Sequence, residues 1–412
     1  MGVATAPSGP AEEGRISRGT DESGSTGPGR AHWLRVAREA ADDLAIDAAA
    51  REQAGKPPFD EVSRLREAGL LTLTAPAGSG GGADRPAAYA VVREIAAADG
   101  AVGQLLGCHY FLSWSASFFA EPALAARIEQ RSAAEQWRWG GGLAHREPVP
   151  TLTRTTRGLV LHGRRSYTSG VPVADRLAVR AVRAGTGEPL AVAVDPGRRG
   201  VRVEDADTFG QRLAGGGSVE FDAVPVAADD VLGSLSADED ILTPRAALAS
   251  PVGRLVSVQL LLGMAEGVLA EAREYSRTGH ASWPAGAPGD PRAPATYGEL
   301  AVLTRSASAL GDQALAALYG GLGRGKDLTY DEYAEIAVLA AMAEAAASRA
   351  ALESTTRALD IVGARSTSAR LGFDRFWRNA RILSPHQPVT HQLSDVGDYF
   401  LHGAHPPFVL PV

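Results

Sequence analysis

The order in which the hydrophobic periodicity changes along the chain constrains its fold more than any other feature. From Ala31 to about residue 150, apolar residues recur at helical spacing, which predicts amphipathic helices. Between about residues 151 and 235 the pattern becomes short β-type runs separated by Gly, Pro and Asp turns. After Pro244 the helical spacing returns and lasts. The sequence therefore predicts a helical domain, a small β domain and a helical bundle, in that order.

These changes divide the chain into four segments. Residues 1–30 are rich in Gly, Ser and Pro and have almost nothing to bury, so we expect a disordered leader. We expect an N-terminal helical domain over 31–150, an antiparallel barrel or sandwich over 151–235, and a helical bundle with a tail over 236–412. Doubly wound and TIM-barrel folds alternate strands with helices, and this chain does not. The predicted fold class is α+β, mostly α.

Composition and charge exclude several classes of function. The 412 residues carry a net charge of −7, and the arginines are scattered, which argues against binding of nucleic acid. No apolar run approaches the ~18 residues of a membrane span and no signal peptide is recognisable, so we expect a cytoplasmic protein. The single cysteine, Cys108, excludes a disulfide or a cysteine-built metal site, and no metal is expected.

A segment near the C-terminus carries the most specific motif. It reads Gly-Phe-Asp-Arg-Phe-Trp-Arg-Asn-Ala-Arg-Ile from Gly372, then Leu-Ser-Pro-His-Gln-Pro. It resembles the segment of the acyl-CoA dehydrogenase superfamily that leads into a loop with the catalytic glutamate. Gln387 stands at that place, with His386 before it, and an amide cannot accept the proton that dehydrogenation of a thioester releases. The segment most resembles the flavin-dependent monooxygenase branch, and the resemblance extends over about residues 31–408.

The resemblance implies an acyl-CoA dehydrogenase-like fold and a two-component monooxygenase. Reduced FMN or FAD would come from a separate NAD(P)H:flavin reductase, and O2 would form a C4a-hydroperoxyflavin. That species would oxidise a small aromatic or heteroatom substrate, such as an indole or a sulfur heterocycle, and the resemblance is compatible with a step in natural-product biosynthesis. The chain has no strand–GxGxxG–helix fingerprint for NAD(P)H, which agrees with a separate reductase. The resemblance also implies a homotetramer, and the choice between FAD and FMN stays open.

Three residues are the candidates for catalysis. His109 matches a histidine that faces the flavin in the monooxygenase branch, although a lone His in an apolar helix alone indicates a hydrogen-bonded core residue. Ser169 lies in Gly163–Gly170, which resembles a segment along the flavin ring; its alternative is a polar turn. His386 stands in the loop that replaces the dehydrogenase base, and imidazole titrates near neutral pH.

The resemblance also assigns residues to the cofactor. Tyr167 and Thr168 would border the flavin beside Ser169 and His386. The backbone amides of Gly142, Leu143 and Ala144 would replace an asparagine of the relatives. Ala364 and Arg365 would meet the flavin phosphate, and the alternative for this arginine is an ordinary surface side chain.

Two other functions remain open from the sequence. One is an acyl-CoA dehydrogenase or oxidase whose base has moved to Glu266, in the helix expected over Leu255–Tyr275. A tightly bound FAD that an acyl-CoA bleaches without oxygen would indicate it. The other is an inactive scaffold that acts through protein contacts, which failure to bind any flavin would indicate.

Overall fold

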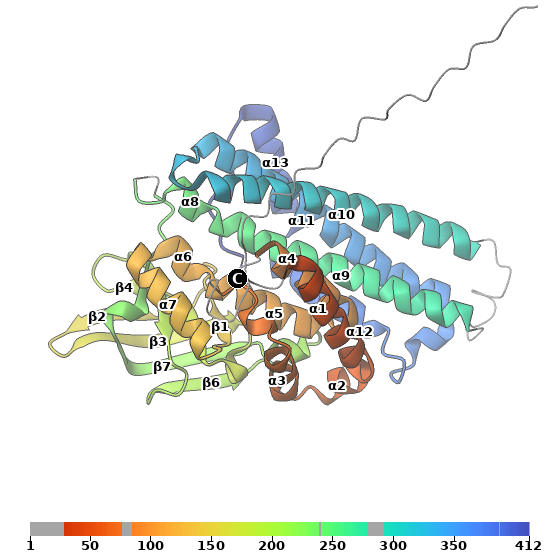
Figure 1. Cartoon of the computed structure of the whole chain (residues 1–412), viewed down its shortest axis with the longest axis horizontal. Helices are drawn as coiled ribbons and strands as arrows, with labels where there is room; N and C mark the ends of the chain where they lie inside the picture. Colours follow the sequence, from red (N-terminus) through yellow and green to blue (C-terminus); the bar gives the residue numbers. More distant parts are fainter. Residues whose placement is uncertain (1–28, 76–84, 239, 279–291, 387, 412) are drawn as a thin grey trace, which may run out of the picture.

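The computed structural model describes residues 29–75, 85–238, 240–278, 292–386 and 388–411. The predicted leader lies almost wholly outside them. In Figure 1 the β sheet lies on one side of the molecule, and the three longest helices run alongside one another on the other side. The N-terminal helices lie between the two, so the predicted order of helical, β and helical parts is confirmed.

The N-terminal part is helical, as predicted. Its helices are α1 (Arg30–Ala45), α2 (Ala48–Ala54), α3 (Phe59–Glu67), the 3-10 turn η1 (Leu70–Thr72), α4 (Arg85–Ala98), α5 (Gly100–Ser113), α6 (Ser115–Phe119) and α7 (Pro122–Ala134). Helix α5 begins after Asp99, whose carboxylate accepts hydrogen bonds from the amides of Ala101 and Val102 at 3.0 and 3.1 Å. Helix α5 is apolar on nearly all sides because almost all of its residues are buried between the other parts.

The β part is a single sheet. Its strands are β1 (Trp139–Gly142), β2 (Thr151–Thr155), β3 (Gly158–Thr168), β4 (Arg176–Arg183), β5 (Pro189–Val194), β6 (Val201–Asp205), β7 (Gly217–Val226) and β8 (Val231–Ser234), with the 3-10 turns η2 (Val171–Val173), η3 (Arg212–Ala214) and η4 (Ala228–Asp230). The order is β6-β7-β3-β2-β4-β5-β8, and β1 pairs with β4. Antiparallel pairing dominates, as expected, but β1 and β2 are both parallel to β4.

Strand β1 precedes residue 151, where we expected the β part to begin. Its sequence, Trp-Gly-Gly-Gly, has little strand propensity, so the period of two is absent there. Gly141 has a φ of 116°, and the carbonyl of Ala178 on β4 occupies the space that a Cβ would need. The close approach of β1 to β4 therefore requires glycine at position 141. The strand forms because it pairs with β4, and not because of its own sequence propensity.

The C-terminal part packs the long helices together. It contains α8 (Pro244–Ala247), α9 (Ala249–Arg277), α10 (Arg292–Arg324), the turn η5 (Gly325–Asp327), α11 (Tyr330–Val362), the turn η6 (Ala364–Thr367), α12 (Asp374–His386) and α13 (Val389–His402). By length and composition Pro244–Arg277 could cross a membrane, but 72% of its most apolar window is buried inside the molecule. It is a central core helix, and its apolar core is continuous with that of the N-terminal helices.

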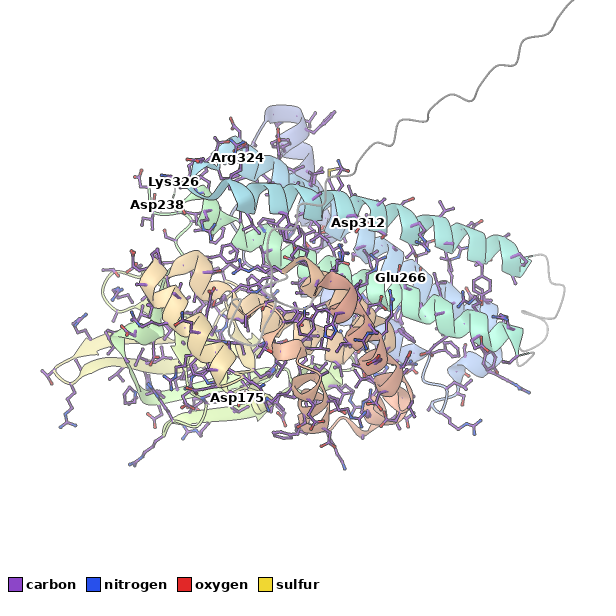
Figure 2. All side chains as sticks on the ribbon, viewed as in Figure 1. Asp175, Asp238, Glu266, Asp312, Arg324 and Lys326 are labelled. Atoms are coloured by element: carbon purple, nitrogen blue, oxygen red, sulfur yellow. The ribbon has the colours of Figure 1, made fainter. Side chains whose placement is uncertain are left out.

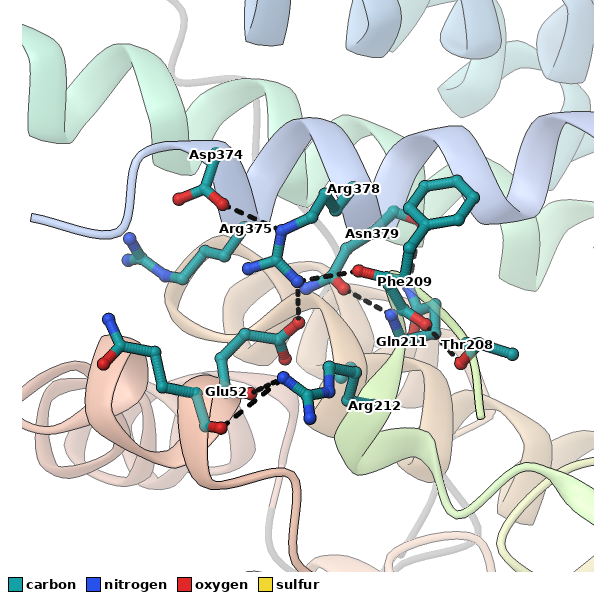
Figure 3. Close-up of polar contacts among 12 residues, drawn as sticks. Glu52, Thr208, Phe209, Gln211, Arg212, Asp374, Arg375, Arg378 and Asn379 are labelled. Carbon is teal, nitrogen blue, oxygen red and sulfur yellow. Dashed lines mark hydrogen bonds and ion pairs between the residues drawn. The ribbon is translucent and has the colours of Figure 1, made fainter. Parts of the chain in front are cut away.

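The Asp-Arg-Phe-Trp-Arg-Asn motif joins the three parts. Arg378 on α12 donates to the Glu52 carboxylate on α2 and to the Phe209 carbonyl before η3, both at 2.8 Å (Figure 3). Asn379 accepts from the Gln211 amide at 2.6 Å and its own carbonyl accepts from the Gln211 side chain at 3.2 Å. We call Glu52, Phe209, Gln211, Arg378 and Asn379 the domain joint.

Candidate active site

A cavity of about 420 Å³ lies where the three parts meet. Its β wall comes from strands β3, β6 and β7 and the loop before β7, with Ser166, Thr168, Ser169, Glu204, Gly216 and Ser218 among its residues. Its helical wall comes from α5, α9, α11 and α12, with Gln104, Ser257, Leu261, Glu344, Ser348 and Leu383 among its residues. The cavity is therefore formed by segments that are far apart in the sequence, and the domain joint is one of the contacts that connect them.

Ser169 is fixed by hydrogen bonds on both sides. Its amide and carbonyl exchange two bonds of 2.9 Å with Gly141 on β1. The next amide, of Gly170, donates to the Ala214 carbonyl in η3 at 2.8 Å. The Ser169 hydroxyl is hydrogen bonded to the Cys108 thiol, whose pKa burial raises to about 11. Ser169 therefore faces the cavity from a rigid backbone, and Cys108 is a neutral, buried thiol.

Two buried arginines support this wall. The Arg138 guanidinium donates to the carbonyl of Gly170, and burial lowers its pKa to about 10, so it stays charged at neutral pH. Gly170 has a φ of 65°, and Arg138 fills the space of a Cβ there. Arg165 donates to the carbonyls of Ala144 and Arg146 at 2.6 and 2.7 Å. These bonds set the course of the chain that leaves β1 and passes the cavity.

The predicted cofactor segments reach the cavity in part. Thr168 and Ala144 line it, and the Thr168 hydroxyl donates to the Gly217 carbonyl at 2.9 Å. Gly142 and Leu143 are buried but are not among the residues that line the cavity. Tyr167 belongs to β3, and its side chain lies outside the described part of the structure.

His109 is in the core instead of on the cavity wall. Its ring is 1% exposed; Nε2 donates to the Leu71 carbonyl at 2.9 Å, and Nδ1 accepts from the Trp139 amide at 3.0 Å. One partner can only accept and the other can only donate, so the ring is neutral with its proton on Nε2. Burial lowers its pKa to about 3. His109 connects α5 with the start of β1, and it is not among the residues that line the cavity.

His386 is the last residue of α12 and not part of a loop. Its side chain and the whole of Gln387 lie outside the described residues. The preceding residues Ile382, Leu383 and Ser384 line the cavity, so the C-terminal end of α12 lies at the cavity wall.

The helical wall contains a buried ion pair that the sequence analysis did not single out. Arg254 on α9 donates to Glu344 on α11 at 3.1 Å, and the two side chains are 8% and 6% exposed. Burial raises the pKa of Glu344 to about 7, and Arg254 opposes this shift. Ser348, one turn further along α11, is 3% exposed, and its hydroxyl has no hydrogen-bond partner in the described part of the chain.

Comparison with known proteins places this architecture in a family. Residues 31–134 match the acyl-CoA dehydrogenase N-terminal domain, and residues 255–391 match the acyl-CoA dehydrogenase C-terminal domain. Dibenzothiophene monooxygenase from Mycolicibacterium goodii is 34% identical over 392 residues, which cover 90% of this chain and 94% of that protein. The chain belongs to the acyl-CoA dehydrogenase superfamily, in the branch of the dibenzothiophene monooxygenases.

Two further relatives lie in the same branch of the superfamily. A probable FMNH2-dependent monooxygenase, SfnC, from Pseudomonas putida is 33% identical and covers 90% of this chain and 95% of its own length. The structure of TdsC from Paenibacillus sp. A11-2 with FMN and indole has a TM-score of 0.84 and 32% identity, and covers 92% of this chain and 100% of that one. The predicted fold and the predicted enzyme class, a monooxygenase of this superfamily, are confirmed.

The acyl-CoA dehydrogenase alternative relied on Glu266, which the structure places elsewhere. Figure 2 shows Glu266 on α9. Its carboxylate accepts two hydrogen bonds from Arg93 on α4, at 2.8 and 2.5 Å, and Arg93 also donates to Ser308 on α10 at 2.9 Å. Glu266 is not among the residues that line the cavity. It connects three helices, and the relatives favour the monooxygenase class over this alternative.

Ala364 and Arg365 are exposed in the turn η6 after α11 and are not among the residues that line the cavity. The resemblance implies a homotetramer, in which a neighbouring subunit would cover part of this surface. An exposed arginine agrees with that arrangement as well as with an ordinary surface position. Its assignment to the flavin phosphate stays a prediction.

Several wall residues were missed because single residues carry weak signals. Gln104 lies in the apolar helix α5, where a polar residue is unusual, and it donates to the Cys108 thiol at 3.1 Å. Glu344 and Ser348 interrupt a long alanine-rich stretch of α11 at a spacing of four, which puts them on one face. A charged residue inside an apolar helical stretch was the available signal. Its partner, Arg254, could not be found without the packing of α9 on α11.

Proposed function

We propose that this chain is the oxygenase component of a two-component system that uses reduced flavin and O2 to oxidise a small aromatic or heteroatom substrate. The observation that carries the proposal is the cavity shared by all three parts, with Ser169 on one wall and the end of α12 on the other. Among the described residues, three carboxylates line it: Glu204 and Glu344 are each paired with an arginine, Arg164 and Arg254, and Asp205 is exposed at the end of β6. The two paired carboxylates are therefore not available as the free base that a thioester dehydrogenase needs.

The residues present suit a flavin. Buried polar atoms without partners are costly, about 1–3 kcal/mol each, unless a ligand supplies the partner. The side-chain oxygen of Gln211 is such an atom on the cavity wall, and it can accept a hydrogen bond from an N–H group of the flavin ring. Ala144, Thr168 and Gly216 line the same wall, so their backbone also lies along the cavity. When bound, reduced flavin would supply the two electrons with which O2 is split into one transferred oxygen atom and water.

The chain's own groups would then orient and protect the reaction. Ser169 lines the cavity and its backbone is hydrogen bonded to Gly141 on β1, so its hydroxyl would be held where it can contact the flavin or the oxygen being transferred. His386, at the end of α12, would hold or move a proton near the reacting centre. His109 would act as a positioning residue that fixes β1, and hence Ala144, through the Trp139 amide. Closure of the cavity by three parts of the chain would limit access of water.

The same proposal names the partners. SfnC is a probable FMNH2-dependent enzyme and TdsC holds FMN together with indole, so we infer FMN, an aromatic substrate and a separate NAD(P)H:flavin reductase. Phe400 and Leu401 on α13 are 86% and 70% exposed, which favours an assembly that covers them, and we propose a homotetramer. Arg365 would then meet the flavin phosphate across a subunit contact. We place the enzyme in the cytoplasm, where reduced flavin is produced.

The test is oxygen incorporation. The purified protein, FMN, a flavin reductase, NADH and catalase are incubated with indole or benzothiophene under ¹⁸O2. We expect a product with one ¹⁸O atom, the second appearing in water, and no product when the oxygenase is left out. Flavin binding without any oxygenated product, together with anaerobic bleaching of bound flavin by an acyl-CoA, would overturn the proposal.

A further inference from the structure

The cavity is polar at its helical wall for a reason that oxygen transfer alone does not explain. Ser169 and the end of α12 account for the β side and the rim. The other polar groups of the helical wall include Gln104, Ser257 and Gln392, and among them Glu344, paired with Arg254, and Ser348 lie on α11, whose neighbouring residues are mostly apolar. A buried ion pair between two core helices is weak as a stabilising device, because apolar residues of similar volume do as well or better.

We propose that Glu344 and Ser348 form a subsite that binds a neutral hydrogen-bond donor of the substrate, a ring N–H or a hydroxyl. Both residues line the cavity from one face of α11, four positions apart. A carboxylate and a serine oxygen both accept hydrogen bonds. The proposal rests on the function proposed above and names its substrate class: aromatic molecules with a donor, ahead of donor-free sulfur heterocycles.

The Ser348 hydroxyl is the observation that points to a ligand. It is 3% exposed and has no partner among the described residues, although α11 carries hydroxyls that do bond to the helix. Thr355, for example, donates to the Ala351 carbonyl at 2.7 Å. A buried hydroxyl at the cavity without a partner is costly in the free enzyme, and a substrate N–H or O–H in the cavity would satisfy it.

Charge decides between a neutral donor and a cation. Arg254 already lies 3.1 Å from the Glu344 carboxylate, so the pair is close to neutral as a whole. An ammonium group beside Glu344 would also lie near the Arg254 guanidinium, and the repulsion would oppose the attraction. A neutral N–H or O–H meets the free acceptor capacity of Glu344 and Ser348 without that repulsion. Tyr333 near Arg254 is neutral at pH 7 because burial raises its pKa to about 12, whereas Asp395 is a second carboxylate that interacts with Arg254, so the tryptamine measurement below tests the neutral-donor assignment directly.

Indole and benzothiophene provide a matched pair of probes. They have nearly the same bicyclic shape, and only indole carries a ring N–H. Their equilibrium affinities for the purified, full-length protein are measured by calorimetry without reductant, so that no turnover is required. We expect at least roughly tenfold tighter binding of indole, because a site built around acceptors rejects an analogue without the donor.

Variants separate the subsite from general packing. Arg254→Met with Glu344→Leu removes both charges together and leaves none unpaired. We expect it to lose most of the indole preference and to bind benzothiophene at least as well as the unaltered chain. Ser348→Ala should reduce the preference by a smaller factor. Ser354→Ala is the control, since this hydroxyl also lies buried in α11 but contacts Thr304 and is not among the residues that line the cavity.

The outcomes distinguish the two proposals. Equal affinities for the probes, or an indole preference that survives in the double variant, would overturn the subsite whatever the enzyme oxidises. Tryptamine binding tighter than indole would overturn the neutral-donor part. An indole preference that depends on Glu344, in a protein that fails the ¹⁸O experiment, would retain the subsite and remove the oxygenase function.

Discussion

Two buried pairs of arginine and glutamate, one in the domain joint and one on the cavity wall, differ in what surrounds them. In the joint, Arg378 donates to Glu52, to the Phe209 carbonyl and to Asp374, so its donors are used by the protein itself. On the wall, Arg254 and Glu344 have each other, with the open cavity beside them. The first pair lies away from the cavity and Arg378 uses its donors within the fold, although Oε2 of Glu52 has no partner among the described residues; in the second pair, Glu344 lines the cavity and can accept from a ligand.

The difference teaches how to separate structural from functional polar groups in this chain. The Asp-Arg-Phe-Trp-Arg-Asn part of the motif, around Arg378, joins three parts and is not among the residues that line the cavity. Several groups that face the cavity come from less distinctive sequence, such as Gln104, Ser348 and Glu344. A polar group whose hydrogen bonds are made within the protein therefore indicates a structural role. A polar group at a cavity with unused hydrogen-bonding capacity indicates ligand binding.

The largest expected effect comes from breaking the joint. Arg378→Met would leave the Glu52 carboxylate, 2% exposed, without its main partner. Burial already raises the pKa of Glu52, and Arg378 opposes that shift. We expect a loss of about 3 kcal/mol in the free energy of unfolding, measured by denaturant titration. Arg38→Met, in an exposed pair with Glu94, is the control and should cost well under ~1 kcal/mol; similar losses in both variants would contradict the role of the joint.

Ser169→Ala tests the cavity side of the comparison. The variant keeps the backbone bonds to Gly141 and loses only the hydroxyl, so we expect a drop of about a hundredfold in the rate of product formation with little change in stability. Product and hydrogen peroxide are measured together, because a serine that protects oxygen transfer should shift reducing equivalents from product to peroxide. Ser166→Ala, on the same wall, is the matched control. Unchanged product yield in Ser169→Ala would remove the serine from the proposed site.

The fold could be predicted well from the sequence because its main signal is long. Helices α9, α10 and α11 each run over many turns, and their periodicity dominates any local exception. Strand β1 was missed because its glycines carry no strand pattern and exist to let β4 approach. His386 was expected in a loop because the resemblance puts the dehydrogenase base loop there, whereas it is the last residue of α12.

The candidate site was predictable only where a motif marked it. Ser169, Thr168 and Ala144, which the resemblance assigned to the flavin because each stands in a glycine-rich segment with a recognisable pattern, line the cavity, and their assignment to the flavin stays a prediction. His109 was expected on the wall, yet its two backbone partners come from η1 and β1, and no local pattern reveals them. Contacts between distant segments decide which polar residue faces a cavity, and a single sequence does not contain them.

His109 provides a pH test of a fully partnered group. Burial lowers its pKa from 6.5 to about 3, so the unfolded chain binds more protons in that window and the folded state loses stability as pH falls through it. We expect the unfolding free energy to fall by about 1.4 kcal/mol per pH unit below about pH 6.5 from this residue alone. His109→Gln should remove this part of the slope, whatever its own stability. An identical slope in both proteins would show that the ring is not held neutral.

The smallest expected change in stability concerns the wall pair. Arg254→Met with Glu344→Leu should stay within about 1 kcal/mol of the unaltered chain, because a buried pair can be replaced by apolar residues at little cost, whereas Glu344→Leu alone would leave Arg254 unpaired. Burial raises the pKa of Glu344 to about 7 from 4.5, so its protonated form favours the folded state and this contribution is lost as pH rises through that window. The free energy of unfolding of the double variant should therefore increase relative to that of the unaltered chain as pH rises from about 4.5 to about 7. Denaturant titrations across this range check it. A large loss in the double variant would mean that this pair, like the joint, serves the fold, and the contrast between the two would disappear.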